Sequence, residues 1–90
     1  MTIEFDAAKR EKTLEERGLD FSRCAEVSAG PSFDLEDHRN DYGERRFVTF
    51  GLLDERMVVI VWTPRGNTRR IISMRKANER EQATFETYLD

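Results

Sequence analysis

The sequence predicts an α+β fold in the order β-α-α-β-β-β-β-α, with an antiparallel sheet packed against helices. Two observations support this prediction. Residues 46–53 (RFVTFGLL) and 57–63 (MVVIVWT) are rich in β-branched and aromatic side chains, and a short polar connection separates them, as in two paired strands. Helix-start and helix-stop residues flank this β-rich half on both sides, which places two helices before the sheet and one after it.

The chain is expected to begin with a short strand at residues 2–5, followed by a helix at 7–17. Asp6 is a suitable N-cap for this helix, because its carboxylate can accept the unpaired N–H groups of the first turn. Gly18 is a suitable stop, since glycine readily adopts the left-handed conformation that ends many helices. The helix is mostly charged and should therefore lie on the surface.

A second helix is expected at residues 21–29, with Asp20 as its cap and Gly30-Pro31 as its end. Val27 is expected to contribute to its burial, because a serine in a core-facing position is unusual. Helical spacing predicts a core-facing stripe at Phe21, Cys24, Ala25 and Ser28.

The remaining strands are predicted to form an antiparallel meander. A strand at 32–36 is followed by a polar turn at 38–43, and the strand at 57–63 is apolar on both faces, as a central strand should be. The turn signal Pro-Arg-Gly-Asn at 64–67 precedes a strand at 68–74.

A last helix should follow Asn78, with Glu81 three residues later as its capping-box partner. The apolar face of this helix is predicted at Phe85, Tyr88 and Leu89.

The 90 residues are expected to form one domain, 1–90, with a single small core. One cysteine, Cys24, excludes an internal disulfide, and no residues show metal-ligand spacing, so no cofactor is expected. There is no signal peptide and no apolar run of membrane-spanning length, which predicts a cytoplasmic protein with no membrane partner.

The positive charge is concentrated near the C-terminus, although the net charge is -3. Residues 65–80 hold six bases and one acid, whereas residues 1–44 hold six bases and twelve acids. Such a patch suits a polyanion or an acidic partner surface. The alternative is a solvated strand edge, because edge strands often carry cations that discourage pairing.

Several segments resemble the BrnT-type toxins, in the family's order and spacing from about residue 5 to residue 86. These segments are Phe5-Asp6-x-x-Lys9, Gly18-Leu19-x-Phe21, Gly43-Glu44-Arg45-Arg46-Phe47-Val48-Thr49-x-Gly51, Arg70-Ile71-Ile72-Ser73-x-Arg75-x-Ala77 and Arg80-Glu81.

The resemblance implies a RelE-like fold and the toxin half of a bacterial type II toxin–antitoxin pair. It also implies cleavage of RNA without a metal, and neutralisation by a cognate DNA-binding antitoxin of the BrnA type. Contact with DNA would then occur only through the antitoxin complex.

The chain departs from the family pattern at three positions. Arg17 and Trp62 stand where many members have histidine, and Ser28 stands where an aromatic residue is common. His38 is left as the one histidine, the residue type whose ordinary pKa lies near neutrality.

Metal-free RNA cleavage needs proton transfer at the 2′ and 5′ oxygens, and cations where charge develops on the phosphoryl oxygens. Arginine suits the second role because its planar fork bonds two phosphate oxygens. The match to the family favours Arg75, Arg70 and Arg46 as catalytic arginines, with Lys76 beside Arg75. His38 completes the predicted catalytic residues, and the predicted RNA-binding residues are Lys9, Arg65 and Arg69.

Period two in the strand at 68–74 predicts Arg69, Ile71, Ser73 and Arg75 on one face, and Arg70, Ile72 and Met74 on the other. Both faces are mixed, so alternation does not decide which arginine meets RNA. Structural roles also remain open: Arg70 paired with Glu81, Arg46 in a surface ion pair, and Trp62 in the core.

A second functional class is also open, in which the domain has the same fold but no catalytic activity. The basic strand would then dock an acidic segment of a partner or help to regulate transcription, and the two missing imidazoles would reflect lost chemistry. Growth arrest on expression of the chain alone separates the two classes.

Overall fold

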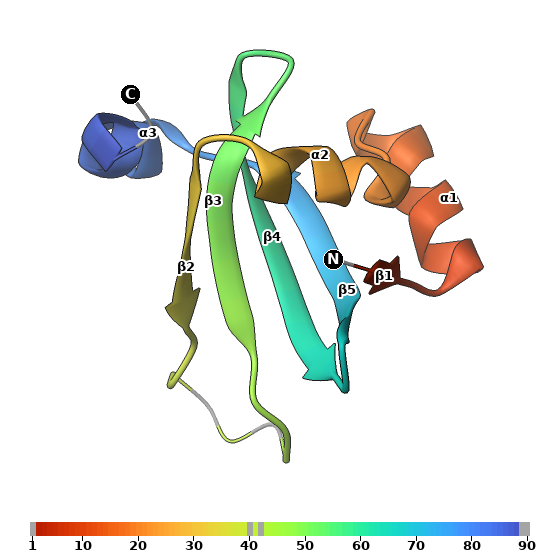
Figure 1. Ribbon diagram of the computed structural model, residues 1–90. Coiled ribbons are helices and arrows are strands. Elements are labelled where there is room, and N and C mark those ends of the chain that lie inside the picture. The colour runs from red at the N-terminus through yellow and green to blue at the C-terminus, as the bar shows by residue number, and fades with distance from the viewer. Residues whose placement is uncertain (1, 40, 42, 89–90) are drawn as a thin grey trace.

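The computed structural model describes residues 2–39, 41 and 43–88, and it has the predicted α+β architecture. Within this part of the chain, five strands form one sheet in the order β1-β5-β4-β3-β2 (Figure 1). The strands are β1 (Thr2–Glu4), β2 (Ser32–Glu36), β3 (Phe47–Leu53), β4 (Arg56–Arg65) and β5 (Thr68–Lys76). The helical elements are α1 (Ala7–Arg17), the 3-10 turn η1 (Phe21–Arg23), α2 (Cys24–Ala29), α3 (Glu79–Phe85) and the 3-10 turn η2 (Glu86–Tyr88).

The sheet is mixed, which corrects the expectation of a purely antiparallel one. Strands β2 to β5 form the predicted antiparallel meander. Strand β1 instead pairs with β5 in parallel, with Thr2 opposite Thr68 and Glu4 opposite Arg70. A parallel partner requires a long crossover, and here residues 5–67 lie between the two strands. Three residues at one end of a sequence carry no signal for such a distant pairing.

Helix α1 is a surface helix, as predicted. Its Asp6 cap accepts from the N–H groups of Ala8 and Lys9, and Gly18 ends it with a φ of 69°. None of its residues is buried. Arg10 connects α1 to the following segment through two hydrogen bonds to Asp20.

The second helical segment buries Phe21, Cys24 and Val27 almost completely. Val27 therefore contributes to the core as predicted, whereas Ala25 is exposed and Ser28 is only half-buried. The predicted stripe was wrong at Ala25, because the segment begins as the 3-10 turn η1 and this changes its phase relative to a regular α-helix.

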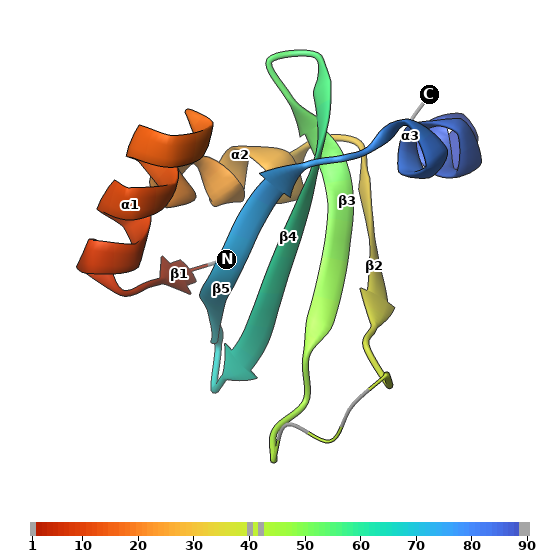
Figure 2. The ribbon, with the colours of Figure 1, turned by 180° about the vertical axis from the view of Figure 1, so that it is seen from behind.

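The sheet presents two different faces. The helix-covered face carries Val58, Ile60 and Trp62, which join the core cluster beneath η1 and α2. The opposite face, named here the pocket face, carries Met57 and Val59 and lies open between α1 and α3 (Figure 2).

A β-bulge divides β5. Val61 lies opposite Ser73 while its neighbour Trp62 lies opposite Ile71, so Ile72 is the extra residue on β5. The predicted face Arg69-Ile71-Ser73-Arg75 is therefore wrong, because the side-chain alternation shifts by one at the bulge. Arg69 and Ile71 share the helix-covered face with Met74, while Ser73 and Arg75 share the pocket face.

The last helix has the predicted capping box between Asn78 and Glu81. Phe85 packs against Phe50 with ring centroids 4.3 Å apart, which fixes α3 over the end of the pocket face. Tyr88 is 69% exposed, and Leu89 of the predicted apolar face lies outside the described residues.

Candidate functional site

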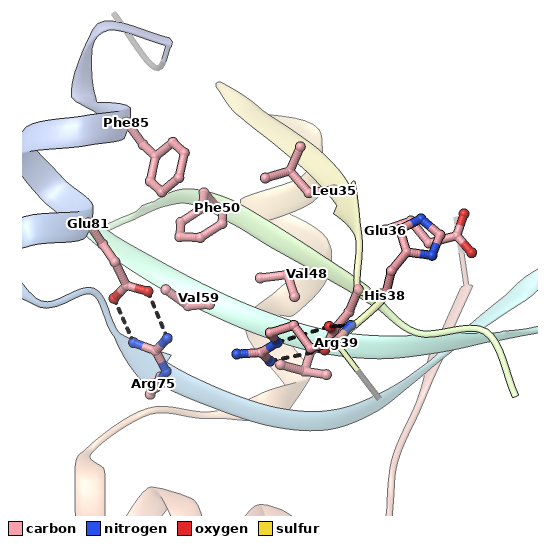
Figure 3. Close-up of a pocket in the computed structure, with 12 residues that line it drawn as sticks. Leu35, Glu36, His38, Arg39, Val48, Phe50, Val59, Arg75, Glu81 and Phe85 are labelled. Atoms are coloured by element: carbon pink, nitrogen blue, oxygen red, sulfur yellow. Dashed lines mark hydrogen bonds and ion pairs between the residues drawn. The ribbon is translucent and has the colours of Figure 1, made fainter. Parts of the chain in front are cut away.

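A pocket of about 680 Å³ opens on the pocket face (Figure 3). Strands β3 and β4 supply an apolar floor, the segment after β2 supplies one wall, and β5 and α3 supply the other. The lining residues are Leu35, Glu36, Asp37, His38, Arg39, Val48, Phe50, Val59, Val61, Arg75, Glu81 and Phe85.

Arg75 lies in this pocket, held by two parallel hydrogen bonds. Its Nη1 and Nη2 donate to Oε1 and Oε2 of Glu81 at 2.7 and 2.8 Å. Glu81 also accepts from the N–H of Asn78, so the capping box fixes the carboxylate that orients the arginine. The hydrogen bond from Arg75 keeps the pKa of Glu81 below its ordinary value, and Glu81 is an anion at neutral pH.

Arg39 occupies the opposite wall and is held in a similar way. Its Nε and Nη2 donate to Oδ1 and Oδ2 of Asp37 at 2.9 and 3.0 Å. Asp37 also accepts from the backbone N–H of Arg39, and its own N–H donates to the carbonyl of Arg46. Pairing with the residue that precedes β3 thus positions the carboxylate, and the carboxylate positions the guanidinium.

Both ion pairs hide the anion and expose the cation. The side chains of Asp37 and Glu81 are 2% and 17% exposed, whereas those of Arg39 and Arg75 are 76% and 44% exposed. The pKa of Arg75 is raised mainly by its hydrogen bonds with Glu81, and the positive charge of Arg39 opposes this rise. The two guanidinium groups therefore repel each other, and an anion bound between them would relieve that repulsion.

His38 lines the same pocket but lies at its rim. Its imidazole lies beside Glu36 and away from Arg75 (Figure 3). The pKa of Glu36 is lowered chiefly by hydrogen bonds from Arg45 and to a smaller extent by His38. The pocket therefore joins two predicted catalytic residues, His38 and Arg75.

Lys76 and Arg70 do not join them. Lys76 lies opposite Val58 on the helix-covered face and lines a separate cavity with Arg17 and Arg56. Arg70 lies near the β1 edge of the sheet, 3.9 Å from a carboxylate oxygen of Glu4. The expected alternative partner of Arg70, Glu81, binds Arg75 instead.

The other predicted site residues are spread over the molecule. Arg46 and Arg65 both lie near Glu44, with N–O separations of 3.8 and 3.6 Å. Arg69 lies on the helix-covered face, where its guanidinium stacks 3.9 Å from the ring centroid of Trp62 and pairs with Asp34. Lys9 is exposed on α1, beside β5.

Two of the departures from the family pattern lie outside the pocket. Trp62 is buried on the helix-covered face, where its Nε1 donates to Thr49 Oγ1 and its ring stacks on Phe47. Arg17 donates from Nη1 to the carbonyl of Met74 and so binds the edge of β5. Neither position lines the pocket, so replacing histidine at these positions does not change the side chains of the pocket.

Sequence reasoning missed Arg39, and it assigned Glu81 to the helix cap or to a pair with Arg70, not to Arg75. The Asp37-x-Arg39 spacing is the available signal for the first, since an aspartate often accepts the N–H two residues later. The pairing of Glu81 with Arg75 depends on how β5 turns into α3, and no sequence pattern specifies that geometry.

No group of three or more His, Cys, Asp or Glu side chains in the described part of the chain is arranged to hold a metal ion. None of the described helices is long and apolar enough to cross a membrane.

Most of the chain matches the model of a known protein family. The model of the family described as "Ribonuclease toxin, BrnT, of type II toxin-antitoxin system" matches residues 5–81. A search of curated proteins found no match to this chain. Because the family model covers most of the chain, this protein belongs to the BrnT family of ribonuclease toxins of type II toxin–antitoxin systems.

Proposed function

We propose that this chain is an active, metal-independent RNA endonuclease, that the pocket between Arg39 and Arg75 is its catalytic site, and that a BrnA-like antitoxin neutralises it. The observation that carries the proposal is the pair of exposed guanidinium groups, each fixed by a shielded carboxylate, over an apolar floor. Fixed cations stabilise developing charge with little reorganisation, which is how an enzyme lowers a barrier electrostatically.

The scissile phosphate would lie between the two guanidinium groups. In the reaction, the 2′ oxygen loses its proton and bonds to phosphorus, while the bond from phosphorus to the 5′ oxygen breaks and that oxygen gains a proton. Negative charge grows on the two remaining phosphoryl oxygens, and we assign their binding to the N–H groups of Arg75 that Glu81 does not engage.

His38 is the proposed proton-transfer group, because an imidazole exchanges protons near neutral pH. Its ring lies at the rim and would turn from Glu36 toward the bound strand. Glu81 is a poor base in this arrangement, since both of its oxygens accept hydrogen bonds from Arg75 and its pKa is lowered. Its proposed role is to position Arg75.

The test is cleavage of single-stranded RNA in EDTA by the purified protein, with DNA of the same sequence as control. DNA should stay intact because it lacks the 2′ hydroxyl, and the RNA products should carry 2′,3′-cyclic phosphate ends. Cleavage only with added magnesium, or equal cleavage of DNA, would contradict the mechanism. RNA binding without any cleavage would favour the non-catalytic interaction domain.

Substitutions in the pocket make this test specific. Arg75→Ala should lower kcat by roughly 10²–10³-fold, the usual effect of removing a donor from developing charge. Arg75→Lys should restore little of the lost activity, because an ammonium group cannot form the bidentate contact that a guanidinium group makes with phosphate. Glu81→Gln should lower activity less than Arg75→Ala, because glutamine keeps the capping box while it releases the arginine. Arg56→Ala, which changes an exposed cation that lines a separate cavity with Arg17 and Lys76, should leave kcat unchanged.

A further inference from the structure

A second depression lies beside β5, next to α1. It has a volume of about 350 Å³ and lies between α1 and the bulged part of β5. Its lining residues are Lys9, Lys12, Thr13, Glu16, Arg17, Ile72 and Ser73. Ser73 lies opposite Val61, which belongs to the pocket floor, and it precedes Arg75 by two residues on the same face. Ser73 therefore lies between the two hollows, which share no lining residue.

The depression is positively charged, and its cations lack carboxylate partners. Lys9, Lys12 and Arg17 line it against one acid, Glu16. Among the described residues, these three cations have no carboxylate oxygen within 4.0 Å, in contrast to Arg10 on the same helix, which binds Asp20.

The fold directs these cations toward β5. Positions 9, 12, 13 and 16 follow the i, i+3, i+4, i+7 spacing of one helix face, so α1 turns a single face to the strand. Arg17 is further fixed by its hydrogen bond of 2.9 Å to the carbonyl of Met74. The positive face of α1 is thus held at a set place relative to Arg75.

We propose that the RNA strand leaves the pocket across Ser73 and continues over α1, where Lys9, Lys12 and Arg17 bind the phosphates next to the scissile one. This inference rests on the proposed function. It adds a row of phosphate contacts, called here the phosphate track, which sets the length of bound RNA and does not distinguish one base from another. Lysine suits this role, because an ammonium on a flexible stem binds a phosphate as a point charge without selecting its orientation.

The track can be tested by binding, without cleavage. The probe is a 2′-O-methyl RNA of about twelve nucleotides, which lacks the attacking hydroxyl. The double variant Lys9→Gln/Lys12→Gln should bind it roughly tenfold more weakly at moderate salt. The slope of log K against log salt should become shallower by about 1.4, because each lost phosphate contact on a single strand contributes about 0.7.

The matched control is Arg56→Gln/Arg80→Gln, which removes two other exposed cations that line neither hollow. It should leave the slope unchanged. An equal change in both double variants would overturn the track, since it would show only a response to net charge. Thermal melts should show that both variants are folded.

Cleavage assays separate this inference from the proposed catalysis. With a long RNA, Lys9→Gln/Lys12→Gln should lower kcat/KM about tenfold, whereas with a dinucleotide that has a single phosphate it should leave kcat/KM unchanged. An equal loss on both substrates would overturn the track. If the wild-type protein binds the probe with the expected slope but cleaves no RNA, the track stands and the proposed catalysis fails. If the double variant keeps its RNA affinity and loses only antitoxin affinity, α1 binds a protein and the track fails.

Discussion

Ser28 lies at the edge of the buried stripe of α2 and lines a cavity of about 360 Å³ with Ile3, Ala25, Ala29 and Arg69. Serine leaves part of this space empty, and Ile3, Ala25 and Ala29 give the cavity a largely apolar lining. Ser28→Phe should raise the free energy of unfolding by about 0.5–2 kcal/mol, as cavity-filling changes commonly do. For a domain of this size, each 1 kcal/mol raises Tm by roughly 4–8 °C.

A thermal melt checks this prediction, with Ser28→Ala as the control that removes the hydroxyl and adds no volume. A lower Tm for Ser28→Phe than for Ser28→Ala would mean that the cavity cannot accept the ring. Activity of the Phe variant should be unchanged, because the cavity lies on the other side of the sheet from Arg75.

At the residue scale, sequence reasoning found side chains whose roles depend on local chemistry. The cap residues Asp6 and Asn78 follow from short-range hydrogen bonding, and the structure has both. Arg75 was predicted as a site residue from the family resemblance, and it lies in the pocket. Arg39 escaped notice because its position depends on Asp37, whose own place is fixed by pairing with the carbonyl of Arg46.

At the element scale, the β3–β4 turn is a strained connection. Asp54 and Glu55 have φ values of 51° and 68°, the left-handed region that two-residue type I′ turns require and that L-residues other than Asn and Asp rarely adopt. Glu55→Gly should therefore raise the free energy of unfolding by about 0.5–1 kcal/mol, since glycine adopts this conformation without the steric cost. Asp54 should be kept, because it accepts two hydrogen bonds from Arg23.

The β4–β5 turn supplies the opposite test. Gly66 has a φ of 60°, and a Cβ placed on it would meet no atom within 4 Å, so Gly66→Ala introduces backbone strain alone. It should lower stability by about 1 kcal/mol, measured by chemical denaturation. If Glu55→Gly also lowers stability, then the Glu55 side chain makes a compensating contact that outweighs the strain.

The connection between α1 and η1 should be sensitive to pH. Hydrogen bonds from Arg10, and then from the backbone of Ser22, hold the pKa of Asp20 well below its ordinary value of 3.8. A carboxylate with a lowered folded-state pKa stabilises the fold above its unfolded value, and that stabilisation is lost as the pH falls through the folded value. Asp20→Asn should thus lower Tm by several degrees at pH 7, and the difference from wild type should shrink as the pH falls below 3.8.

Asp6→Asn is the matched control for this experiment. Asparagine is as good a helix cap as aspartate, so both variants keep their caps, and only Asp20→Asn loses an ion pair with Arg10. An Asp20→Asn variant whose Tm deficit is the same at every pH would show that the carboxylate charge does not stabilise the fold.

Element boundaries were predictable where they depend on local pattern. The strands at 47–53, 56–65 and 68–76 begin and end within two residues of the predicted 46–53, 57–63 and 68–74. The three main helical segments also lie where the sequence placed them. The bulge at Ile72 and the parallel pairing of β1 were not predicted, because both depend on contacts between segments far apart in the chain. The bulge matters most for function, because it changes which side chains share a face with Arg75.

At the scale of the whole molecule, the sheet separates cations that the sequence places side by side. Arg75 and Lys76 are neighbours in the chain, but they serve opposite faces of the sheet. The cluster of bases in the sequence is therefore divided between at least two surfaces. One is the pocket, which contains Arg75, and the other is the separate cavity that Lys76 lines with Arg17. The likeness to RelE-type ribonucleases stays a prediction.

This separation gives a direct test of where the antitoxin binds. The pocket face joins Arg75 with apolar side chains exposed to solvent, including Leu35 at 47% and Tyr88 at 69%. A partner segment with acidic and apolar side chains would cover this face and exclude RNA by occupying the same guanidinium groups. We therefore expect Arg75→Glu to weaken antitoxin binding at least tenfold, measured by titration calorimetry at fixed salt.

Charge reversal on the other face provides the comparison. Lys76→Glu and Arg69→Glu change side chains on the helix-covered face, and they should alter antitoxin affinity far less than Arg75→Glu does. Lys76→Glu is the cleaner of the two, because Arg69 also binds Asp34 and stacks on Trp62, so that its loss disturbs the fold. If Lys76→Glu proves the more damaging change, the antitoxin binds the helix-covered face. Inhibition would then have to act through the sheet, because the partner would leave the pocket open.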